Sequence, residues 1–323
     1  MNALVTGGHG FLGAEIVRQL RAAGHTATPV SRQSGVDIVE PGSLRAAMTG
    51  HDTVFHVAAL AGVWGRRQDF ERTNIEGTRS VLTACRDLGI TRIIYTSSPS
   101  VTFDGHDHTN AGNDLPYPTS WLADYPRTKA EAERLVLAAN SAQIATVALR
   151  PHLIYGPGDP HLLPRLLARA RAGRLRIVGE GQNLVSLSFV ENAASAHVAA
   201  ALGLSPGAPC AGKAYFVNDA EPVRVWDWLN EVFAALGVPS VTRRVPAGVA
   251  YGAGVLLEGA WSIFGLDGEP PMTRFVAKQL STSHTYDLGP ARDDLGWTPA
   301  VDGREAQRRT IEALRASGAP TGG

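Results

Sequence analysis

A phenol and an ammonium group stand one helical turn apart in the segment Tyr125-Pro126-Arg127-Thr128-Lys129. Side chains four residues apart share a helix face, so both are expected to point toward the loop that follows residues 91–96. A nearby ammonium favours phenolate and lowers the pKa of a tyrosine, which is about 10 when free. Ser98 on that loop can hydrogen-bond a carbonyl oxygen that gains negative charge. These residue types predict proton transfer at a carbonyl or alcohol, with Tyr125 as the acid or base.

The alternative is that Tyr125 and Lys129 form an incidental surface pair. Lys129 is one of only three lysines, although Lys and Arg together number 30, so a lysine inside this pattern argues for a role. Asn74 lies within a predicted helix over residues 70–89, where Asn is a poor interior residue. We expect Asn74 to bend that helix or to have a polar role, such as completing a proton path through water.

A glycine-rich loop follows the first predicted strand, residues 3–6. Gly7, Gly10 and Gly13 recur every third residue, and Leu12, Ile16 and Leu20 then follow the spacing of a buried helix face. Glycines allow the backbone to approach a pyrophosphate, and the helix N-terminus offers free N–H groups. A strand, a glycine turn and a helix in this order predict a dinucleotide site. The alternative, a glycine-rich turn without a ligand, leaves the regular spacing unexplained.

The residues after the second predicted strand, 26–30, bear on the choice of nucleotide. NAD-binding enzymes usually carry an acid here that holds the ribose 2′-OH, whereas this chain has Ser31 and Arg32. A guanidinium suits a 2′-phosphate, so NADP(H) is favoured over NAD(H). The alternative is that Arg32 is one more solvated arginine. Asp37, in a short strand predicted over residues 36–38, is expected to face the adenine edge.

The elements that must position these groups alternate along the first 150 residues. Further strands are predicted over residues 53–59, 91–96 and 144–149, with helices over residues 41–50, 70–89 and 125–140. This alternation predicts an α/β fold with a doubly wound parallel sheet, whose ligands gather beyond the carboxyl ends of the strands. His56 ends the fourth predicted strand and is expected to be packed. Ala58 and Ala59 after it leave room for a cofactor.

The second half of the chain is expected to form a smaller, mostly helical substrate lobe. We place a nucleotide-binding Rossmann domain over residues 1–150 and the lobe mainly over residues 151–316. A strand over residues 213–217 is expected to return to the first sheet. Residues 317–323 are rich in Gly, Pro and Ala and are predicted to be a disordered tail.

Composition excludes several classes of protein. The formal net charge is zero, so nothing favours nucleic acid as a partner. Cys85 and Cys210 are too few for a disulfide framework. Residues 104–119 include Asp104, His106 and His108, but their spacing is irregular, so we expect a solvated surface loop and no metal site. No charged and apolar leader precedes the first strand, which favours a cytoplasmic protein.

The most apolar stretch, residues 247–257, ends at Glu258 and is expected to be too short to span a bilayer. Over residues 247–264 the alternatives are a cap on a lipid pocket, a peripheral membrane contact, or an ordinary buried helix of the small lobe. The buried helix is the favoured interpretation.

Several motifs together resemble one enzyme superfamily. They are TGGHGFLG (6–13), HVAA (56–59), TNIEGT (73–78), YTSSPSV (95–101), YPRTK (125–129) and LRPHLIYGPGD (149–159). The chain resembles the extended short-chain dehydrogenases/reductases over nearly its whole length, and within them the 3β-hydroxysteroid dehydrogenase branch. The resemblance implies an NAD(P)-dependent ketoreductase or alcohol dehydrogenase, with reduction of a 2-alkyl-3-oxo fatty acid in long-chain olefin synthesis as the leading expectation.

The resemblance also implies roles for individual residues. Those that match the family's catalytic positions are Ser98, Tyr125, Lys129 and Asn74. Those expected at the cofactor are Gly7, Gly10, Phe11, Leu12, Gly13, Ser31, Arg32, Asp37, Ile38, His56, Ala58, Ala59, Tyr125, Lys129, Pro151, His152, Leu153 and Ile154, of which the last four match the segment that covers the nicotinamide.

One departure from the superfamily narrows the substrate. Nucleotide-sugar enzymes generally carry an Asn shortly after the Arg of the sixth strand, where this chain has His152-Leu153. Apolar and aromatic residues are expected at the pocket instead, which suits long alkyl chains or a sterol, although they could equally be core. The substrate residues expected are Trp64, Ser100, Phe103, Trp121, Leu162 and Leu163.

The sequence is compatible with other functions as well. A sterol or 3β-hydroxysteroid dehydrogenase would use the same chemistry with a different pocket, and a nucleotide-sugar epimerase or dehydratase is a further alternative. A non-catalytic NADP-sensing regulator would keep the glycine loop but lose the Tyr/Lys pair. Relatives commonly dimerise through the helices that hold Asn74 and Tyr125–Lys129, so a homodimer is expected, and a complex with pathway enzymes is an open alternative.

Overall fold

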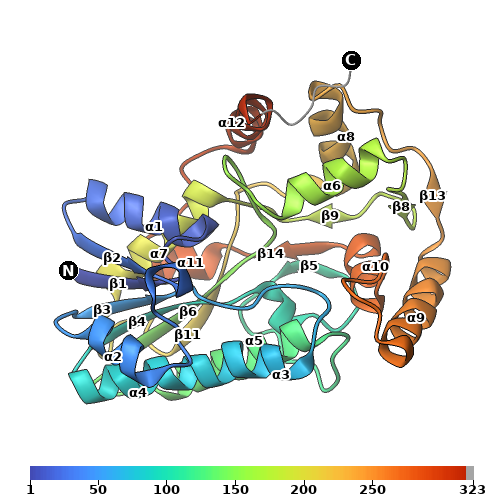
Figure 1. The fold of residues 1–323 in the computed structure, drawn as a ribbon. Helices are drawn as coiled ribbons and strands as arrows, with labels where there is room; N and C mark the ends of the chain where they lie inside the picture. The colour runs from blue at the N-terminus through green and yellow to red at the C-terminus, as the bar shows by residue number, and fades with distance from the viewer. Residues whose placement is uncertain (318–323) are drawn as a thin grey trace.

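The computed structural model describes residues 1–317 and contains one large parallel sheet between two layers of helices (Figure 1). Its strand order is β11-β6-β4-β3-β1-β2, and every neighbouring pair is parallel. The strands are β1 (Asn2–Thr6), β2 (Thr26–Val30), β3 (Thr53–His56), β4 (Arg92–Thr96), β6 (Ala145–Pro151) and β11 (Lys213–Val217). The prediction of a doubly wound α/β fold is confirmed, as is the return of residues 213–217 to this sheet.

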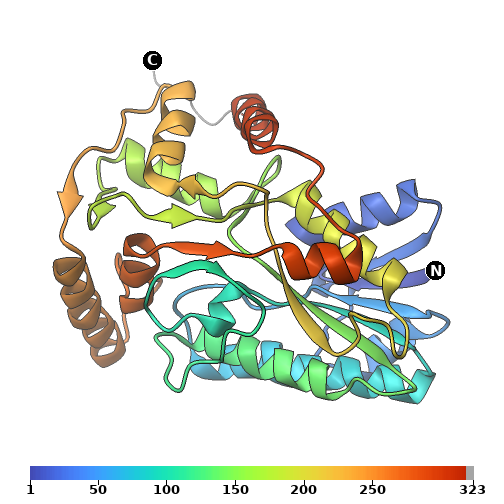
Figure 2. The ribbon, with the colours of Figure 1, turned by 180° about the vertical axis from the view of Figure 1, so that it is seen from behind.

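Helices cover both faces of the sheet, and the central strands β1, β3, β4 and β6 are almost entirely buried, as expected for a parallel sheet. On one face Ala3 and Val5 pack with helices α1 (Phe11–Ala22), α7 (Val190–Gly203) and α11 (Gly289–Leu295). On the other face Leu4 packs with α2 (Pro41–Met48), α4 (Gly77–Leu88) and α5 (Asp124–Ala138). Figures 1 and 2 show these two layers from opposite sides, with α4 and α5 together under the sheet.

A second hydrophobic core lies beyond the sheet, around Trp226, Phe233 and Leu163. The helices that contribute to it are α6 (Leu162–Arg171), α8 (Val225–Ala235), α9 (Ala247–Phe264), α10 (Arg274–Ser281) and α12 (Gly303–Ala316). Short strands accompany them: β5 (His108–Ala111), β7 (Ile154–Tyr155), β8 (Ile177–Val178), β9 (Leu184–Val185), β10 (Ser188–Phe189), β12 (Val223–Arg224), β13 (Arg244–Val245) and β14 (His284–Tyr286).

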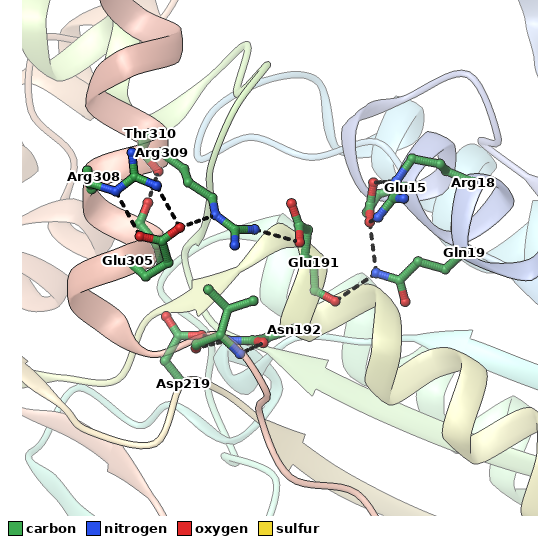
Figure 3. Close-up of polar contacts among 12 residues, drawn as sticks. Glu15, Arg18, Gln19, Glu191, Asn192, Asp219, Glu305, Arg308, Arg309 and Thr310 are labelled. Carbon is green, nitrogen blue, oxygen red and sulfur yellow. Dashed lines mark hydrogen bonds and ion pairs between the residues drawn. The ribbon is translucent and has the colours of Figure 1, made fainter. Parts of the chain in front are cut away.

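A polar network joins the helix α12 to the layer that covers the sheet (Figure 3). Arg309 contacts Glu305 at 2.7 Å within α12 and Glu191 at 3.1 Å on α7. Gln19 of α1 donates to the Glu191 carbonyl at 2.9 Å. The first turn of α7 therefore links helices that lie almost 300 residues apart in the sequence.

Two sequence predictions about local structure are wrong. Residues 36–38 form no strand, because β2 is the edge of the sheet and a left-handed Gly35 ends a short turn before them. Residues 104–119 are not only a solvated loop, because β5 pairs with β14 and its His108 is buried. The predicted disordered tail lies outside the described residues, apart from Ser317.

The apolar stretch at residue 247 also differs from its prediction. Helix α9 continues past Glu258 to Phe264 and is long and apolar enough, by length and composition alone, to cross a membrane. One such helix is weak evidence of a membrane span. The favoured interpretation as a buried helix is wrong, since only 17% of it is buried and Leu256, Ile263 and Phe264 are among its exposed side chains.

Candidate active site

The glycine loop lies between β1 and α1 and forms one end of a cavity of about 690 Å³. Gly7 has φ +66°, and a Cβ on Gly13 would lie 2.2 Å from the Gly7 carbonyl oxygen, so side chains are excluded where the turn is tightest. Gly10 precedes α1, and no side chain caps the first amides of that helix. These free N–H groups and the absence of side chains suit a pyrophosphate, so the residues present fit a dinucleotide.

Eight of the predicted cofactor residues line this cavity: Gly7, Gly10, Ser31, Arg32, Asp37, Ile38, Ala58 and Ala59. Other predicted cofactor residues do not line the cavity. Leu12 and Gly13 are buried in the packing between α1 and the sheet, and Phe11 packs partly against the same core. His56 is buried with its ring nitrogens 2.9 Å from Thr6 Oγ1 and 3.0 Å from Thr78 Oγ1, as expected for a packed histidine. Burial lowers the pKa of His56 to about 3.

Sequence reasoning missed several residues of the cavity wall. His9 of the glycine loop places its Nδ1 3.0 Å from Ser31 Oγ, and Arg72, Thr73 and His161 also line the cavity. His9 lies within the recognised motif and could have been included. His161 comes from the second half of the chain, and no local pattern indicates that it returns to this cavity.

Where the cavity lies beside the end of β2, its wall includes a positively charged side chain. Arg32 lines it, and within residues 1–317 Arg32 makes no ion pair with a carboxylate. Ser31 starts the short turn at residues 32–34, where its amide donates to Ser34 Oγ at 2.9 Å. Asp37 accepts from the Val39 amide at 3.2 Å. The arrangement can hold a phosphate on the ribose through Arg32.

Ser98, Tyr125 and Lys129 are brought together where β4 ends and α5 begins. Ser98 follows β4 and accepts from the Ser100 hydroxyl at 2.9 Å. A hydrogen bond from Ser98 lowers the pKa of Tyr125, but burial raises it by more, so that the pKa lies above its usual value. Tyr125 stands in the first turn of α5, and Lys129 is one turn further along the same helix.

The environment of Lys129 differs from the sequence prediction. Its side chain is buried, Nζ donates to the Thr96 carbonyl at 2.6 Å, and Nζ lies 4.1 Å from the centroid of the Tyr95 ring. Burial lowers the pKa of Lys129 to about 7, and Glu133 opposes this. The expectation that Lys129 lowers the pKa of Tyr125 is not met in this arrangement, because burial raises that pKa and only the hydrogen bond with Ser98 opposes the rise.

Asn74 lies in a π-helical turn, Glu71–Glu76, between the short helix α3 (Arg67–Phe70) and α4. Its Oδ1 accepts from the Leu60 amide at 2.8 Å, and its Nδ2 donates to the Leu60 carbonyl and to Thr128 Oγ1. Within a π-helical turn, Asn74 therefore has a polar contact with each of two segments, while the proton path through water stays a prediction. Asn74 fastens the wall of the cofactor cavity at Leu60 to the helix that carries Tyr125 and Lys129.

A buried ion pair between Glu133 and Arg150 joins α5 to β6. Glu133, one turn after Lys129, receives Arg150 at 2.6 and 3.0 Å, and both side chains are at most 3% exposed. Tyr117 also donates to Glu133, at 2.7 Å. Since Arg150 lies near the end of β6, this contact fixes α5 against the strand that leads to Pro151 and His152.

Residues 151–154, which are expected to cover the nicotinamide, are held in place by contacts with residues 186 and 188. Pro151 ends β6, and Ile154 begins the short strand β7. The His152 ring donates to the Ser186 carbonyl at 2.8 Å, and the His152 amide donates to Ser188 Oγ. Leu153 has φ +47°, a conformation unusual for a leucine. These four residues do not line the cofactor cavity.

The predicted substrate residues are not gathered at one place. Trp64 and Trp121 line a second cavity of about 490 Å³. Ser100 is buried against Ser98, whereas Phe103 is buried with its ring edge-on to Phe275 and His284. Leu162 is half-buried beside the second core. Leu163 is fully buried within that core, so it does not lie at a pocket rim.

Comparison with known proteins places the chain in a family. Residues 26–246 match the 3-beta hydroxysteroid dehydrogenase/isomerase family. The chain is 46% identical to the 2-alkyl-3-oxoalkanoate reductase of Stenotrophomonas maltophilia, with 99% of this chain and all of that protein covered. It is 34% identical to the decarboxylating sterol-4-alpha-carboxylate 3-dehydrogenase of Mus musculus, with 96% and 90% covered.

Solved structures support the same fold. MoeE5 in complex with UDP-glucose and NAD superposes with a TM-score of 0.75 at 25% identity, covering 98% of this chain and 99% of that chain. A UDP-galactose 4-epimerase superposes with a TM-score of 0.72 at 21% identity, covering 98% and 99%, and this likeness concerns the fold alone. With the glycine loop, the cavity and the Ser98–Tyr125–Lys129 group described above, the chain belongs to the 3-beta hydroxysteroid dehydrogenase/isomerase family of extended short-chain dehydrogenases/reductases and is an NAD(P)-dependent oxidoreductase.

Proposed function

We propose that the protein reduces the 3-oxo group of a 2-alkyl-3-oxoalkanoate to a 3-hydroxy group, with NADPH as the reductant. The observation that carries this proposal is the 46% identity, over the full length of both chains, to a reductase named for that substrate. A second relative of the same name, from Shewanella oneidensis, is 45% identical over 97% of this chain. The step lies in long-chain olefin synthesis.

In this proposal Tyr125 donates the proton and Ser98 hydrogen-bonds the substrate oxygen. Bound NADPH supplies the hydride to the carbonyl carbon. Tyr125 is protonated at neutral pH, since a free tyrosine has a pKa of about 10 and burial raises the pKa of Tyr125 further, so its proton is available to the forming alkoxide. Lys129 holds the nicotinamide ribose and returns a proton to Tyr125. Asn74 keeps α5 in register with the cofactor cavity.

The preference for NADP(H) over NAD(H) rests on Arg32 and Ser31. Arg32 lines the cavity without a carboxylate partner among the described residues, so a 2′-phosphate would provide its counter-charge. A planar guanidinium recognises phosphate through paired hydrogen bonds. The remaining predicted cofactor residues, including Pro151 to Ile154, belong to the same proposal.

A sterol substrate is the second candidate, because the family also contains the mouse sterol-4-alpha-carboxylate 3-dehydrogenase at 34% identity. Both candidate substrates are largely apolar and carry a carboxylate on the carbon that neighbours the reacting C3, so the catalytic group would serve either. A nucleotide sugar is less favoured. The solved neighbours that bind one share at most 25% identity, and His152-Leu153 replace the Asn that such enzymes place after the strand.

Assembly and location are also proposals. We infer a homodimer through α4 and α5, the helices that the superfamily uses, and a complex with pathway enzymes remains open. A cytoplasmic location is inferred, with α9 as the segment that could rest on a membrane, in view of its exposed Leu256, Ile263 and Phe264.

The test is oxidation of NADPH, with NADH beside it, against a 2-alkyl-3-oxo fatty acid and a 3-oxosteroid, while conversion of UDP-glucose to an epimer or a dehydrated sugar is followed by chromatography. Turnover of the fatty acid with NADPH preferred is the expected result. Turnover of the steroid alone would move the protein to the sterol branch and leave the catalytic roles intact. Turnover with UDP-glucose alone would overturn the proposal.

A further inference from the structure

Exposed apolar side chains are concentrated on helix α9 and the residues that follow it. Of the eight large apolar side chains that are exposed within residues 1–317, six lie between positions 249 and 266: Val249, Val255, Leu256, Ile263, Phe264 and Leu266. Val249, Leu256 and Ile263 are seven residues apart, so they lie along one face of the helix. Such a concentration marks a binding surface, whereas single exposed apolar residues are ordinary.

Another side of α9 is packed against α10 and carries the only charge of the helix. Glu258, the one charged residue of α9, is buried and accepts from the Arg274 amide at 2.7 Å and from Arg274 Nε at 2.6 Å. A Cβ on Gly254 would lie 2.7 Å from the Arg274 amide nitrogen, so the two helices are in close contact. Because this side holds α9 to the fold, the exposed apolar face is suited to lie on a membrane rather than to span it.

A cluster of arginines borders the beginning of α9. In Figures 1 and 2 the end of α6, β8 and β13 lie along the same edge of the molecule as α9. Strand β13 leads directly into α9, and its pairing with β8 places Arg244 opposite Ile177. Six arginines of this edge make no ion pair with a carboxylate of residues 1–317: Arg169, Arg171, Arg174, Arg176, Arg243 and Arg244.

The arginine cluster gives this edge an excess of positive charge. The carboxylates nearest to it in sequence are Glu180, after β8, and Asp267, after α9, while Glu269 is already paired with Arg165 at 2.8 Å. The formal net charge of the whole chain is zero, so the cluster is a local asymmetry. A guanidinium binds phosphate through paired hydrogen bonds, and an apolar helix face beside basic side chains is typical of binding to an anionic membrane surface.

We propose that α9 and the arginine cluster dock the protein on a membrane surface that contains anionic phospholipids. The exposed apolar side chains of α9 enter the boundary between the headgroups and the acyl chains, and the arginines contact lipid phosphates. The proposal extends the location proposed above for α9 and rests on none of the residues assigned to the reaction. Each arginine near such a surface raises the partition coefficient about fivefold.

The first experiment is co-sedimentation of the full chain with vesicles. Vesicles of phosphatidylcholine and phosphatidylglycerol in equal parts are compared with vesicles of phosphatidylcholine alone, at low and at high salt. We expect binding to the anionic vesicles at low salt, and binding weaker by about tenfold or more without the anionic lipid or at high salt, where exposed charges are screened. No binding to the anionic vesicles, or equal binding to both kinds, would overturn the proposal.

Leu256→Gln, with Leu202→Gln as its matched control, tests the apolar face. Both leucines are exposed, at 76% and 60%, and Leu202 lies on α7, away from α9. We expect Leu256→Gln to weaken binding to the anionic vesicles about tenfold or more, because an apolar side chain no longer leaves water, and Leu202→Gln to bind as the wild type does. Equal binding by the two variants would show that α9 is not the docking face.

Arg244→Gln and its control Arg304→Gln test the charge. Arg304 is exposed on α12 and also makes no ion pair with a carboxylate of the described residues. We expect Arg244→Gln to weaken binding to the anionic vesicles about fivefold and Arg304→Gln to leave it unchanged. An equal loss in both variants would mean that charge acts without regard to position, against the proposed orientation.

A second copy of this chain is the other occupant that the apolar face could have, and sedimentation equilibrium without vesicles detects it. Loss of a self-association step in Leu256→Gln, with vesicle binding unchanged, would overturn the proposal in favour of a protein interface. Oxidation of NADPH by the same variants is measured without vesicles, on a short, soluble 2-alkyl-3-oxo acid, and is expected to equal that of the wild type. Failure of vesicle binding and failure of the proposed reaction are therefore separate results.

Discussion

At the residue scale, burial determines the state of the catalytic group more than neighbouring charge does. Tyr125, Lys129 and His56 all have pKa values shifted first by burial. The residue types and the spacing of Tyr125 and Lys129 could be predicted from the sequence. The extent of burial could not, because it depends on Tyr95 and Thr96 of β4, which close over Lys129 only in the folded chain.

Replacing Tyr125 by Phe removes the proposed proton donor and little else. We expect kcat for reduction to fall about 100-fold to 10,000-fold, while the dissociation constant of NADPH changes less than about tenfold. Steady-state kinetics and titration of NADPH fluorescence measure the two effects. Tyr215→Phe is the control, since Tyr215 lies on β11 and its hydroxyl donates to Asp294 of α11. Undiminished turnover in Tyr125→Phe would contradict the role of Tyr125 as the proton donor.

Arg32→Ala tests the choice of nucleotide. A hydrogen bond to a charged group contributes about 1.5–3 kcal/mol, so KM for NADPH should rise about 10-fold to 100-fold while KM for NADH stays within about twofold. The ratio of the two KM values, measured with one substrate, gives the result directly. An equal rise for both nucleotides would mean that Arg32 only stabilises the turn at residues 32–34.

At the element scale, local patterns predicted the strands of the sheet but not the contacts between distant segments. The apolar runs of β1, β3, β4 and β6 are bounded by turn residues and are covered on both faces, so their signal was strong. Strand β5 exists because it pairs with β14, which lies about 175 residues later. Glu258 in the middle of α9 is paired with Arg274 of α10, 16 residues later. Neither partner can be identified from a local window.

Glu133→Gln tests the buried pair that holds α5 against β6. Removing one partner of a buried ion pair costs about 3–5 kcal/mol, because the other charge is left uncompensated. We expect the free energy of unfolding in urea to fall by that amount. Glu312→Gln, which breaks the exposed contact with Arg308 on α12, should cost about 0.5 kcal/mol or less. Similar losses in the two variants would contradict the role given to Glu133.

At the scale of the whole molecule, the first half of the chain forms most of the large sheet, and later segments pack back onto that sheet. Later in the chain, strand β11 joins the sheet, and helices α7 and α11 pack on it. The remaining helices form the second core, and one of them, α9, lines the second cavity. The alternation of strands and helices in the first 150 residues made the sheet predictable. The position of α9 was not predictable, since an apolar stretch is equally compatible with a core helix, a lipid cap or a membrane contact.

Buried histidines predict how the whole fold responds to acid. Burial lowers the pKa of His56 to about 3 and those of His152 and His197 to about 4. The unfolded chain therefore binds protons below about pH 6.5 that the folded chain does not accept, and stability falls as the pH falls from there toward about 4. Each histidine lowers the free energy of unfolding by about 1.4 kcal/mol per pH unit over this range, which is about 4 kcal/mol per pH unit for the three together. Thermal unfolding between pH 7 and 4.5 measures this loss, and a constant Tm would contradict it; His106→Gln, an exposed site, should leave the profile unchanged.

Transfer of hydride from NADPH to the 3-oxo carbon of the substrate can be measured directly with deuterium. NADPH deuterated at the transferred position is incubated with the protein and a 2-alkyl-3-oxoalkanoate, and the product is analysed by mass spectrometry. We expect a 2-alkyl-3-hydroxyalkanoate that carries one deuterium at the carbon of the new alcohol, and loss of this product in Tyr125→Phe. A hydroxy acid without deuterium, or an unchanged oxo acid while a sterol is converted, would contradict this expectation.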